Sequence, residues 1–306
     1  MLEVTLLGCG GSMPIPNRYL SATLLQYKGR KILIDCGEGT QVSMKAINTG
    51  FKTLDLICIT HLHGDHINGL PGLLATLGNS GRKDPVFIMG PVGTKALFGA
   101  FQILVPHLPF DIQILEKGFK SNELTPLNLT NEIQVSILDL DHSAPCIGYR
   151  FEVKRRPKFD VEKAIANQVP KFLWSSLQKT SEVVFEDKIY NQEMVLGESR
   201  RGILVSLITD TRPIPEIIPF INQSDLFICE GTYGSDDNLK KAMANKHMTF
   251  SEAATLAKAG QVKALLLTHF GVALKEPEAY AEVARRIFTE TKIGQDQLKI
   301  ELKFAE

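Results

Sequence analysis

One short segment concentrates the groups that can do chemistry. Residues 60–66 read Thr-His-Leu-His-Gly-Asp-His, which places three imidazoles and one carboxylate side by side. The apolar run at 54–59 precedes them, so the cluster stands where a predicted buried strand ends and a loop begins. Imidazole together with carboxylate suits Zn²⁺, and also Mn²⁺ or Fe. A cluster this dense can serve two adjacent ions, and two-metal sites are typical of hydrolases, often of phosphodiesters.

A two-metal site needs more ligands, and the chain has only seven His in which to search for them. Three candidates, His142, Asp210 and His269, each follow an apolar run at a predicted strand end. Because strand ends are rigid and lie side by side, their side chains can converge on one cavity. We therefore expect His61, His63 and His142 to bind one ion, Asp65, His66 and His269 to bind the second, and Asp210 to bridge the two.

Glu230 and His247 fit a role in proton transfer. Glu230 ends another apolar run, and His247 precedes a predicted helix. A carboxylate bonded to one nitrogen of His247 would orient the ring and favour its cationic form. The pair is thus a candidate proton donor to a leaving alkoxide, with a surface histidine as the open alternative. We expect Asp35 to brace the ligand loop by hydrogen bonds, and His107 to be structural.

The composition limits the class of protein. With 306 residues and 44% hydrophobic side chains, the chain can form one large domain with an inserted element. The 34 basic and 34 acidic residues balance, which excludes a basic field over the whole surface, so any nucleic-acid contact needs a local patch. The five Cys form no CxxC pair and are expected to be reduced and buried. No membrane-length apolar stretch and no signal peptide are found, so we expect a soluble cytoplasmic protein.

Periodicity predicts an α/β fold. Short runs rich in Val, Ile and Leu predict strands at 4–7, 22–26, 31–34, 54–59, 86–89, 112–115, 133–140, 147–153, 203–208, 226–229 and 264–267. Helical spacing is found at 39–49, 70–77, 94–104, 251–258 and 277–289. Thr249 to Glu252 form a capping box, and Gly260 ends that helix. Strands first, followed by strands alternating with helices, indicate two sheets between helices in a four-layer αββα arrangement.

Residues 154–200 differ from the rest of the chain. This polar segment reads as poor in helix, and between Lys154 and Lys179 it has seven Lys or Arg against two acidic residues. It also contains the only Trp, Trp174, with Phe159 and Phe172 expected to be exposed. We interpret it as an arm inserted into a single domain that spans 1–306. An ordinary polar surface excursion is the alternative.

Several motifs together resemble a known family. The cluster at 61–66, with His142, Asp210 and His269 after it in that order, is similar to the metallo-β-lactamase superfamily. Within that superfamily the chain resembles the ribonuclease Z family, which are tRNA 3′-end endonucleases. The matching stretches are 8–14 with Arg18 and Ser21, 34–41, 61–73, 148–150 and 210–213, with Glu230 and His247. The resemblance covers nearly the whole chain and implies a metallo-β-lactamase sandwich with an inserted arm.

The resemblance also implies an activity and partners. It implies a zinc-dependent phosphodiesterase that cleaves the 3′ trailer of tRNA precursors, by attack of a hydroxide that bridges two Zn²⁺ ions. Asp65 would orient the nucleophile as well as bind metal, and His247 with Glu230 behind it would protonate the leaving O3′. The family is commonly a homodimer, and its arm grips the tRNA elbow. The Lys and Arg excess of the arm would then contact phosphates without reading bases.

Two alternatives stay open. Residues 270–274 are apolar where the family has Ser and Arg, and Val169-Pro170 stands where its arm has Gly-Pro. The first alternative to tRNA cleavage is a metallo-β-lactamase-fold hydrolase of a small phosphodiester or another ester, and the apolar run at 270–274 and the zero net charge are its main support. The other alternative is a non-catalytic metal-binding protein. The complete ligand set argues against it.

Overall fold

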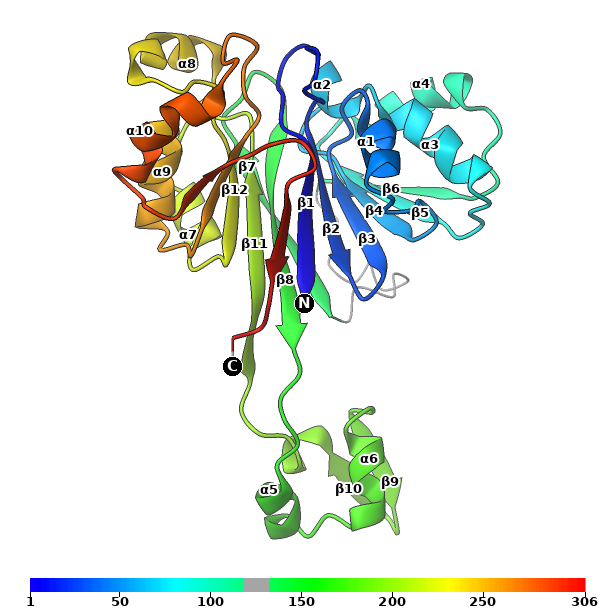
Figure 1. Ribbon diagram of the computed structural model, residues 1–306. Helices are drawn as coiled ribbons and strands as arrows, with labels where there is room; N and C mark the ends of the chain where they lie inside the picture. Colours follow the sequence, from blue (N-terminus) through cyan, green and yellow to red (C-terminus); the bar gives the residue numbers. More distant parts are fainter. Residues whose placement is uncertain (118–131, 306) are drawn as a thin grey trace. The chain divides into compact units, whose positions relative to one another are not determined.

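The computed structural model describes residues 1–117 and 132–305, which form two compact units (Figure 1). The first unit contains residues 1–153 and 203–303. The second contains residues 154–202 and the chain from Phe304 onward. All the predicted ligands, together with Glu230 and His247, belong to the first unit.

Two sheets form the centre of the first unit. The first sheet has the order β15-β1-β2-β3-β4-β5-β6, in which β3 to β6 pair in parallel. Its strands are β1 (Leu2–Gly8), β2 (Ala22–Tyr27), β3 (Arg30–Ile34), β4 (Leu54–Cys58), β5 (Val86–Gly90), β6 (Ile112–Glu116) and β15 (Lys299–Leu302). The second sheet has the order β14-β13-β12-β11-β8-β7, in which β11 to β14 pair in parallel. Its strands are β7 (Ile133–Leu140), β8 (Cys146–Arg155), β11 (Arg200–Ile208), β12 (Leu226–Glu230), β13 (Leu265–Thr268) and β14 (Thr291–Ile293).

Helices cover the outer faces of both sheets (Figure 1). On the first sheet, Leu33 and Ile57 of the strands share one buried cluster with Leu73 and Phe98 of the helices. The helices on this side are α1 (Thr40–Ala46), α3 (Leu70–Asn79) and α4 (Thr94–Leu104). The helices beside the second sheet are α7 (Ile217–Ile221), α8 (Leu239–Asn245), α9 (Phe250–Ala259) and α10 (Ala281–Arg285). The predicted four-layer αββα arrangement is therefore confirmed.

The parallel strands explain how distant residues can meet. Every residue of β4 and β12 is buried, as expected for strands covered on both faces. Asp35 follows β3 directly, and His61 comes soon after β4. Asp210 and His269 follow β11 and β13 in the second sheet. Because ligand sites in α/β folds lie outside the carboxyl ends of parallel strands, these loops are where a site is expected.

The predicted elements are present, with one error of extent near the C-terminus, and several short elements were not predicted. All the predicted strands are present, and Thr249 and Glu252 make the predicted capping box at the start of α9. The helix predicted over 277–289 is wrong in extent, since a 3₁₀ turn η5 (Pro277–Tyr280) and the short α10 replace it. The chain must leave the helix early because β14 begins at Thr291 and pairs with β13. The strands β14 and β15 were not predicted, since runs of three and four residues give too short a pattern.

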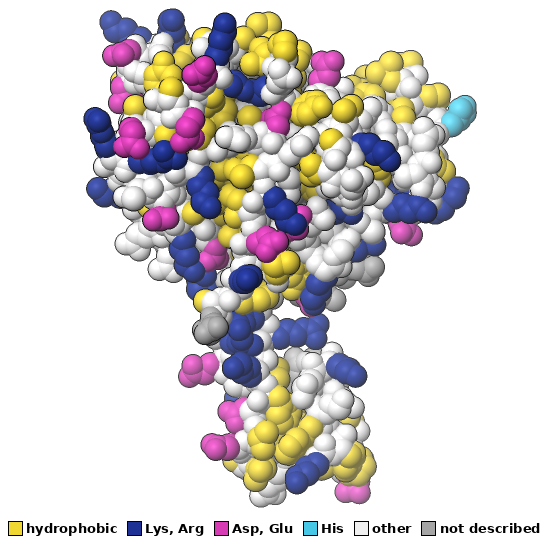
Figure 2. Space-filling model, viewed as in Figure 1, with side chains coloured by type: hydrophobic (Ala, Val, Ile, Leu, Met, Phe, Trp, Pro, Cys, Tyr) yellow, Lys and Arg dark blue, Asp and Glu magenta, His cyan; other side chains and the backbone are white. Residues whose placement is uncertain are grey.

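The second unit has a small core of its own. Its elements are α5 (Val161–Ala166), η2 (Lys171–Leu173), α6 (Trp174–Leu177), β9 (Glu182–Phe185), β10 (Lys188–Asn191) and η3 (Gln192–Met194). The segment predicted to be poor in helix has two short α-helices, and Asp160 caps the first of them by accepting from Lys163 N. Phe159 and Trp174 pack together, with ring centroids 5.1 Å apart, so Phe159 is not exposed as predicted. Phe172 is 63% exposed, and other apolar side chains gather on the face of this unit seen in Figure 2.

Two further predictions concern the surface and the thiols. All five Cys are buried and unpaired, as expected. Over the first unit, Lys and Arg are interspersed with Asp and Glu on the face seen in Figure 2. In the two described ranges, no helix has the length and apolar character that a membrane span requires.

Candidate metal centre

The first predicted ligand group comes together as His61, His63, His142 and Asp210. His63 Nδ1 lies 3.0 Å from His61 Nε2 and 3.2 Å from His142 Nε2. Asp210 Oδ2 lies 3.6 Å from His61 Nε2 and 3.9 Å from His142 Nε2. Four donor atoms from loops after β4, β7 and β11 therefore face one another within a small volume.

The second group comes together as Asp65, His66, His269 and again Asp210. His66 Nε2 and His269 Nε2 lie 3.2 Å apart. Asp65 Oδ2 lies 3.3 Å from His269 Nε2 and 3.5 Å from His66 Nε2. Asp65 and His66 belong to the short helix α2 (Gly64–Ile67), which starts within the cluster and so points two successive side chains at it.

Asp210 joins the two groups with different oxygens. Its Oδ2 faces the first group, while its Oδ1 lies 3.2 Å from His269 Nε2 and 3.4 Å from His66 Nε2. The carboxyl is buried, which raises its pKa. The charges of His269 and His66 outweigh that effect and hold the pKa of Asp210 well below its usual range. The residue predicted to bridge is therefore an ionised carboxylate between the two sets of imidazoles.

The donor set and spacing fit divalent metal ions. Nitrogens bound to one Zn²⁺ at about 2.0–2.1 Å in a tetrahedron lie about 3.3 Å from each other. The nitrogen pairs described above, at 3.0 to 3.2 Å, are close to that separation. Burial and the neighbouring His66 lower the pKa of His61 to about 2, so this ring is neutral and offers a lone pair. Facing lone pairs repel unless a proton or a cation lies between them.

Several candidate site residues that follow strand ends have a left-handed backbone conformation. Asp35, Asp210 and His269 all have positive φ, at 58°, 54° and 55°. Lys246, beside His247, has φ 56°. Such left-handed residues are uncommon outside glycine, although Asp and His are enriched among them. Each costs about 1 kcal/mol or more and persists only where the surrounding contacts hold it, as at functional sites.

Hydrogen bonds on the outer side of the rings fix their orientation. Asp35 Oδ2 lies 2.7 Å from His66 Nδ1, and its two oxygens also accept from Thr60 N and Thr60 Oγ1, both at 2.8 Å. Thr60 Oγ1 lies 3.1 Å from His61 Nδ1. His142 Nδ1 lies 3.2 Å from the carbonyl oxygen of Lys246. Asp35 thus makes the bracing contacts predicted for it, which leave His66 Nε2 facing the cluster.

The loop after β1 closes over the second group. Ser12 N donates to Asp65 Oδ2 at 2.6 Å. Gly11 lies so close to His269 that an added Cβ would stand 2.4 Å from the imidazole ring. A side chain at Gly11 would therefore displace a predicted ligand. The stretch was noted in the sequence, but nothing there showed that it touches the cluster.

Glu230 and His247 form the predicted pair. The two oxygens of Glu230 lie 3.1 and 3.3 Å from His247 Nδ1. Glu230 is fully buried and also accepts from Thr211 N at 2.7 Å and from Met248 N at 3.0 Å. Burial lowers the pKa of His247, but the charge and hydrogen bond of Glu230 outweigh it and raise the pKa to about 9. His247 is therefore protonated at neutral pH, as a proton donor must be.

Thr232 links this pair to the second ligand group. Its hydroxyl donates to Glu230 Oε2 at 2.7 Å and lies 3.1 Å from His269 Nδ1. A hydroxyl can donate one proton and accept another, so His269 Nδ1–H can donate to it. One buried carboxylate thus orients His247 directly and His269 through Thr232. Sequence reasoning missed Thr232, because a Thr at a strand end carries no metal-ligand signal.

The backbone of His247 is also fixed by a hydrogen bond to its carbonyl oxygen. The guanidinium of Arg212 donates to the carbonyl oxygen of His247 and pairs with both oxygens of Glu252. Glu252 is the residue that completes the capping box of α9. The seventh histidine, His107, is exposed and outside the three metal-type clusters found among the described residues. This position agrees with the expectation that His107 is not a ligand.

Comparison with known proteins gives the family. A family model described as Anti-Pycsar protein Apyc1 matches residues 2–157. The chain is 58% identical to the ribonuclease Z of Clostridium beijerinckii over 307 residues, covering 100% of both chains. It is 54% identical to the ribonuclease Z of Clostridium tetani, covering 99% of both.

Solved structures confirm the fold. The short form of human tRNase Z matches with a TM-score of 0.69 and 24% identity, over 99% of this chain and 100% of that one. The metallo-β-lactamase fold protein YhfI from Bacillus subtilis matches with a TM-score of 0.68 and 21% identity, over 98% and 100%. With full-length relatives above half identity and this fold, the chain belongs to the ribonuclease Z family, metal-dependent hydrolases of the metallo-β-lactamase fold.

Proposed function

We propose that this chain is an endoribonuclease that removes the 3′ trailer from tRNA precursors. The relatives that match it over their full length carry the name ribonuclease Z, and a structural neighbour is named a tRNase Z. The observation that carries the proposal is the position of Asp210, with one oxygen toward each ligand group. The Glu230–His247 pair beside it supplies what phosphodiester cleavage needs besides metal.

The cofactor of this proposal is a pair of divalent ions, with zinc as the metal and Mn²⁺ or Fe as substitutes. The first ion would be held by His61, His63 and His142, the second by Asp65, His66 and His269, and Asp210 would hold both. Such a pair supplies Lewis acidity: it lowers the pKa of water and offsets charge on a phosphate.

The side chains of the chain would carry the proton transfers. Asp65 faces the cluster and also lines a cavity of about 430 Å³ together with His142 and His247. An oriented carboxylate there can align an attacking water for in-line attack. Cleavage breaks the P–O3′ bond, and His247 gives its proton to the departing O3′. The products are a 3′-hydroxyl and a 5′-phosphate. Glu230 stabilises the cationic imidazole before transfer and holds the ring in place.

Residues 154–200 are proposed as the arm that contacts the tRNA. The excess of seven basic over two acidic residues between Lys154 and Lys179 supports contact with phosphates. We further propose that the protein acts as a homodimer in the cytoplasm. Deleting residues 154–200 should raise KM for a tRNA precursor and leave hydrolysis of bis-(p-nitrophenyl) phosphate unchanged. Equal effects on both substrates would remove the arm from the proposal.

The direct test is cleavage of a 3′-extended tRNA precursor by the purified full chain, with bis-(p-nitrophenyl) phosphate in parallel. We expect a single cut that leaves a 3′-hydroxyl on the tRNA. The rate should fall steeply as salt rises, because contacts to phosphates release counterions. The small diester should show little salt dependence. Hydrolysis of the small diester without any cut in the RNA would favour the small-phosphodiester alternative.

A further inference from the structure

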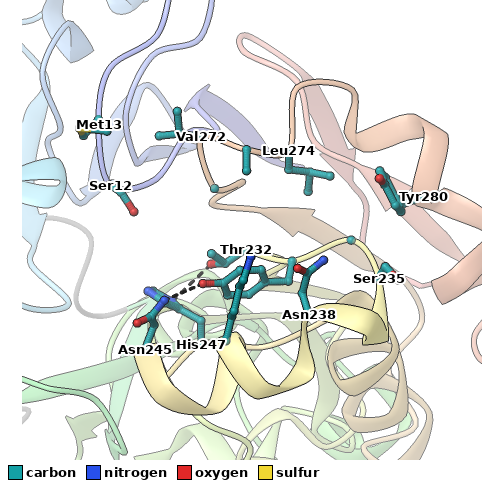
Figure 3. Close-up of a pocket in the computed structure, with 15 residues that line it drawn as sticks. Ser12, Met13, Thr232, Ser235, Asn238, Asn245, His247, Val272, Leu274 and Tyr280 are labelled. Carbon is teal, nitrogen blue, oxygen red and sulfur yellow. Dashed lines mark hydrogen bonds between the residues drawn. The ribbon is translucent and has the colours of Figure 1, made fainter.

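Helix α8 ends two residues before the proposed proton donor. Asn245 is its last residue and, together with His247, borders a cavity of about 420 Å³ (Figure 3). Between these two residues, Lys246 has φ 56° and ψ 49°, the left-handed conformation in which many helices end, usually at glycine. His247 N then donates to the carbonyl oxygen of Ala242 at 2.8 Å. The turn at Lys246 therefore fixes the backbone of His247 against the last turn of α8.

The same turn directs the carbonyl oxygen of Lys246 at a predicted metal ligand. This oxygen lies 3.2 Å from His142 Nδ1. The imidazole can donate to it because its other nitrogen, Nε2, faces the first ligand group. If α8 continued, the carbonyl would point along the helix axis and accept from the following turn instead. The left-handed conformation therefore lets one residue orient the ring of His142 and place His247.

Charged side chains hold the turn on both sides. The ammonium of Lys246 lies 2.6 Å from Asp141 Oδ1 and 3.4 Å from the carbonyl oxygen of His142. The guanidinium of Arg212 donates to the carbonyl oxygen of His247, and Arg212 N donates to that of Asp141 at 3.0 Å. The side chains of the Lys246–Asp141 pair are 41% and 44% exposed, so the pair contributes little by itself. The backbone conformation is therefore the feature of Lys246 that should matter most.

We propose that Lys246 is a positioning residue that couples the first ligand group to the proton donor. Its carbonyl oxygen holds the ring of His142, and its left-handed turn sets the position of His247. A metal ligand and the donor thus share one backbone unit, which keeps the donor at a fixed place relative to the first ion. The inference rests on the proposed cleavage for the role of His247, whereas the contact with His142 can be tested by metal binding alone.

Helix α9 ends with the same hydrogen-bond pattern and offers a matched control. Gln261 has φ 50°, and Val262 N donates to the carbonyl oxygen of Ala257 at 3.2 Å, as His247 N does to that of Ala242. Gln261 is exposed and belongs to none of the three metal-type clusters found among the described residues. A side chain that resists the left-handed conformation should therefore strain the two helix ends alike, with an effect on the metal centre only at Lys246.

Chelator competition with Zn²⁺, without RNA, tests the contact with His142. In Lys246→Val, whose β-branched side chain resists the turn, affinity for the first ion should fall about tenfold, with the second ion unchanged. Lys246→Gly adopts the turn freely and should recover the affinity to within about twofold, and Gln261→Val should lose none. Lys246→Ala strains the turn less and should show a smaller loss, so the test survives if the Val variant does not fold. An unchanged first ion in both, or an equal loss in Lys246→Gly, would overturn the proposal.

Two substrates at saturating Zn²⁺ test the link to His247. Bis-(p-nitrophenyl) phosphate releases nitrophenolate, a stable anion that needs little protonation, whereas the tRNA precursor releases an alkoxide that needs a proton. Lys246→Val should therefore lower kcat about tenfold for the RNA, with KM unchanged, and only about twofold for the small diester. Lys246→Gly should recover the RNA rate. Equal losses on both substrates would overturn the coupling. Failure of the unaltered chain to cut the RNA would instead reject the proposed function, and the chelator experiment would still decide the contact with His142.

Discussion

The two halves of the metal centre have similar donors but different support. In the second group, His66 is braced by the carboxylate of Asp35, and His269 contacts Thr232, whose hydroxyl donates to Glu230. In the first group, His61 contacts Thr60, whose hydroxyl donates to Asp35, and His142 has only a backbone carbonyl. Among the described residues, no imidazole of the first group therefore contacts a bracing carboxylate directly as His66 does. A carboxylate behind an imidazole raises its basicity and fixes its tautomer. We therefore expect the second group to hold its ion more tightly than the first.

Replacement of Asp210, the predicted shared ligand, should weaken metal binding in both groups and so abolish the expected difference in their affinities. Asp210→Ala takes one donor from each group, so metal content should fall from about two ions per chain to fewer than one, and turnover by about 10³-fold or more. Elemental analysis and cleavage of the tRNA precursor measure the two effects. A variant that keeps two ions would show that Asp210 does not bridge.

A side chain added at Gly11 should reduce metal binding in the second group and leave the first group unchanged. Gly11→Ala pushes against the His269 ring, so one ion per chain should be lost, with a fall in turnover of about 10²-fold or more. Gly99→Ala is the control, because a Cβ there meets nothing within 4 Å. Metal content after dialysis against a chelator measures the effect. Loss of both ions, or of neither, would contradict the assignment of His269.

The proton donor should control the alkaline side of the pH profile. His247 with a pKa of about 9 is protonated below that pH and loses its proton above it. Turnover should therefore fall as pH rises through about 9. In His247→Ala, turnover should be about 10²-fold lower and that fall should vanish, with two ions still bound. An unchanged alkaline fall in the variant would assign it to another group, and lost metal would make His247 a ligand.

Loss of the Thr232 hydroxyl, which contacts His269, should have the smallest effect on metal affinity among these changes. Thr232→Val removes the hydroxyl and keeps the shape, so affinity for the second ion should fall about tenfold, while the first ion is unaffected. Thr232→Ser restores the hydroxyl and should recover the affinity. Competition with a chelator measures both ions. Equal weakening in the Val and Ser variants would show that side-chain packing, not the hydrogen bond, is what matters.

The candidate ligands could be found from the sequence because clustered His and Asp side chains are unusual and each follows a predicted strand. Clustered His and Asp after apolar strands are rare by chance, so His142, Asp210 and His269 could be found by looking at strand ends. The strands themselves follow from buried apolar runs, and α9 from its capping box. The short edge strands β14 and β15 lack such a pattern.

What the sequence could not show are contacts made through space. Gly11 against His269 and Thr232 between Glu230 and His269 depend on loops from different sheets meeting. The positive φ of Asp210 and His269 is also invisible in the sequence, since tertiary contacts impose it. The apolar run at 270–274 was read as evidence against RNA, whereas in the structure Val272 and Leu274 form one wall of a cavity with a polar side.

Anomalous diffraction at the zinc edge, from crystals of the chain grown with Zn²⁺, tests the central claim most directly. We expect two peaks, one within bonding distance of His61, His63 and His142 and one of Asp65, His66 and His269, with Asp210 between them. On titration with a chelator, the peak in the first group should weaken before the other. A single peak, or peaks away from these side chains, would contradict the account.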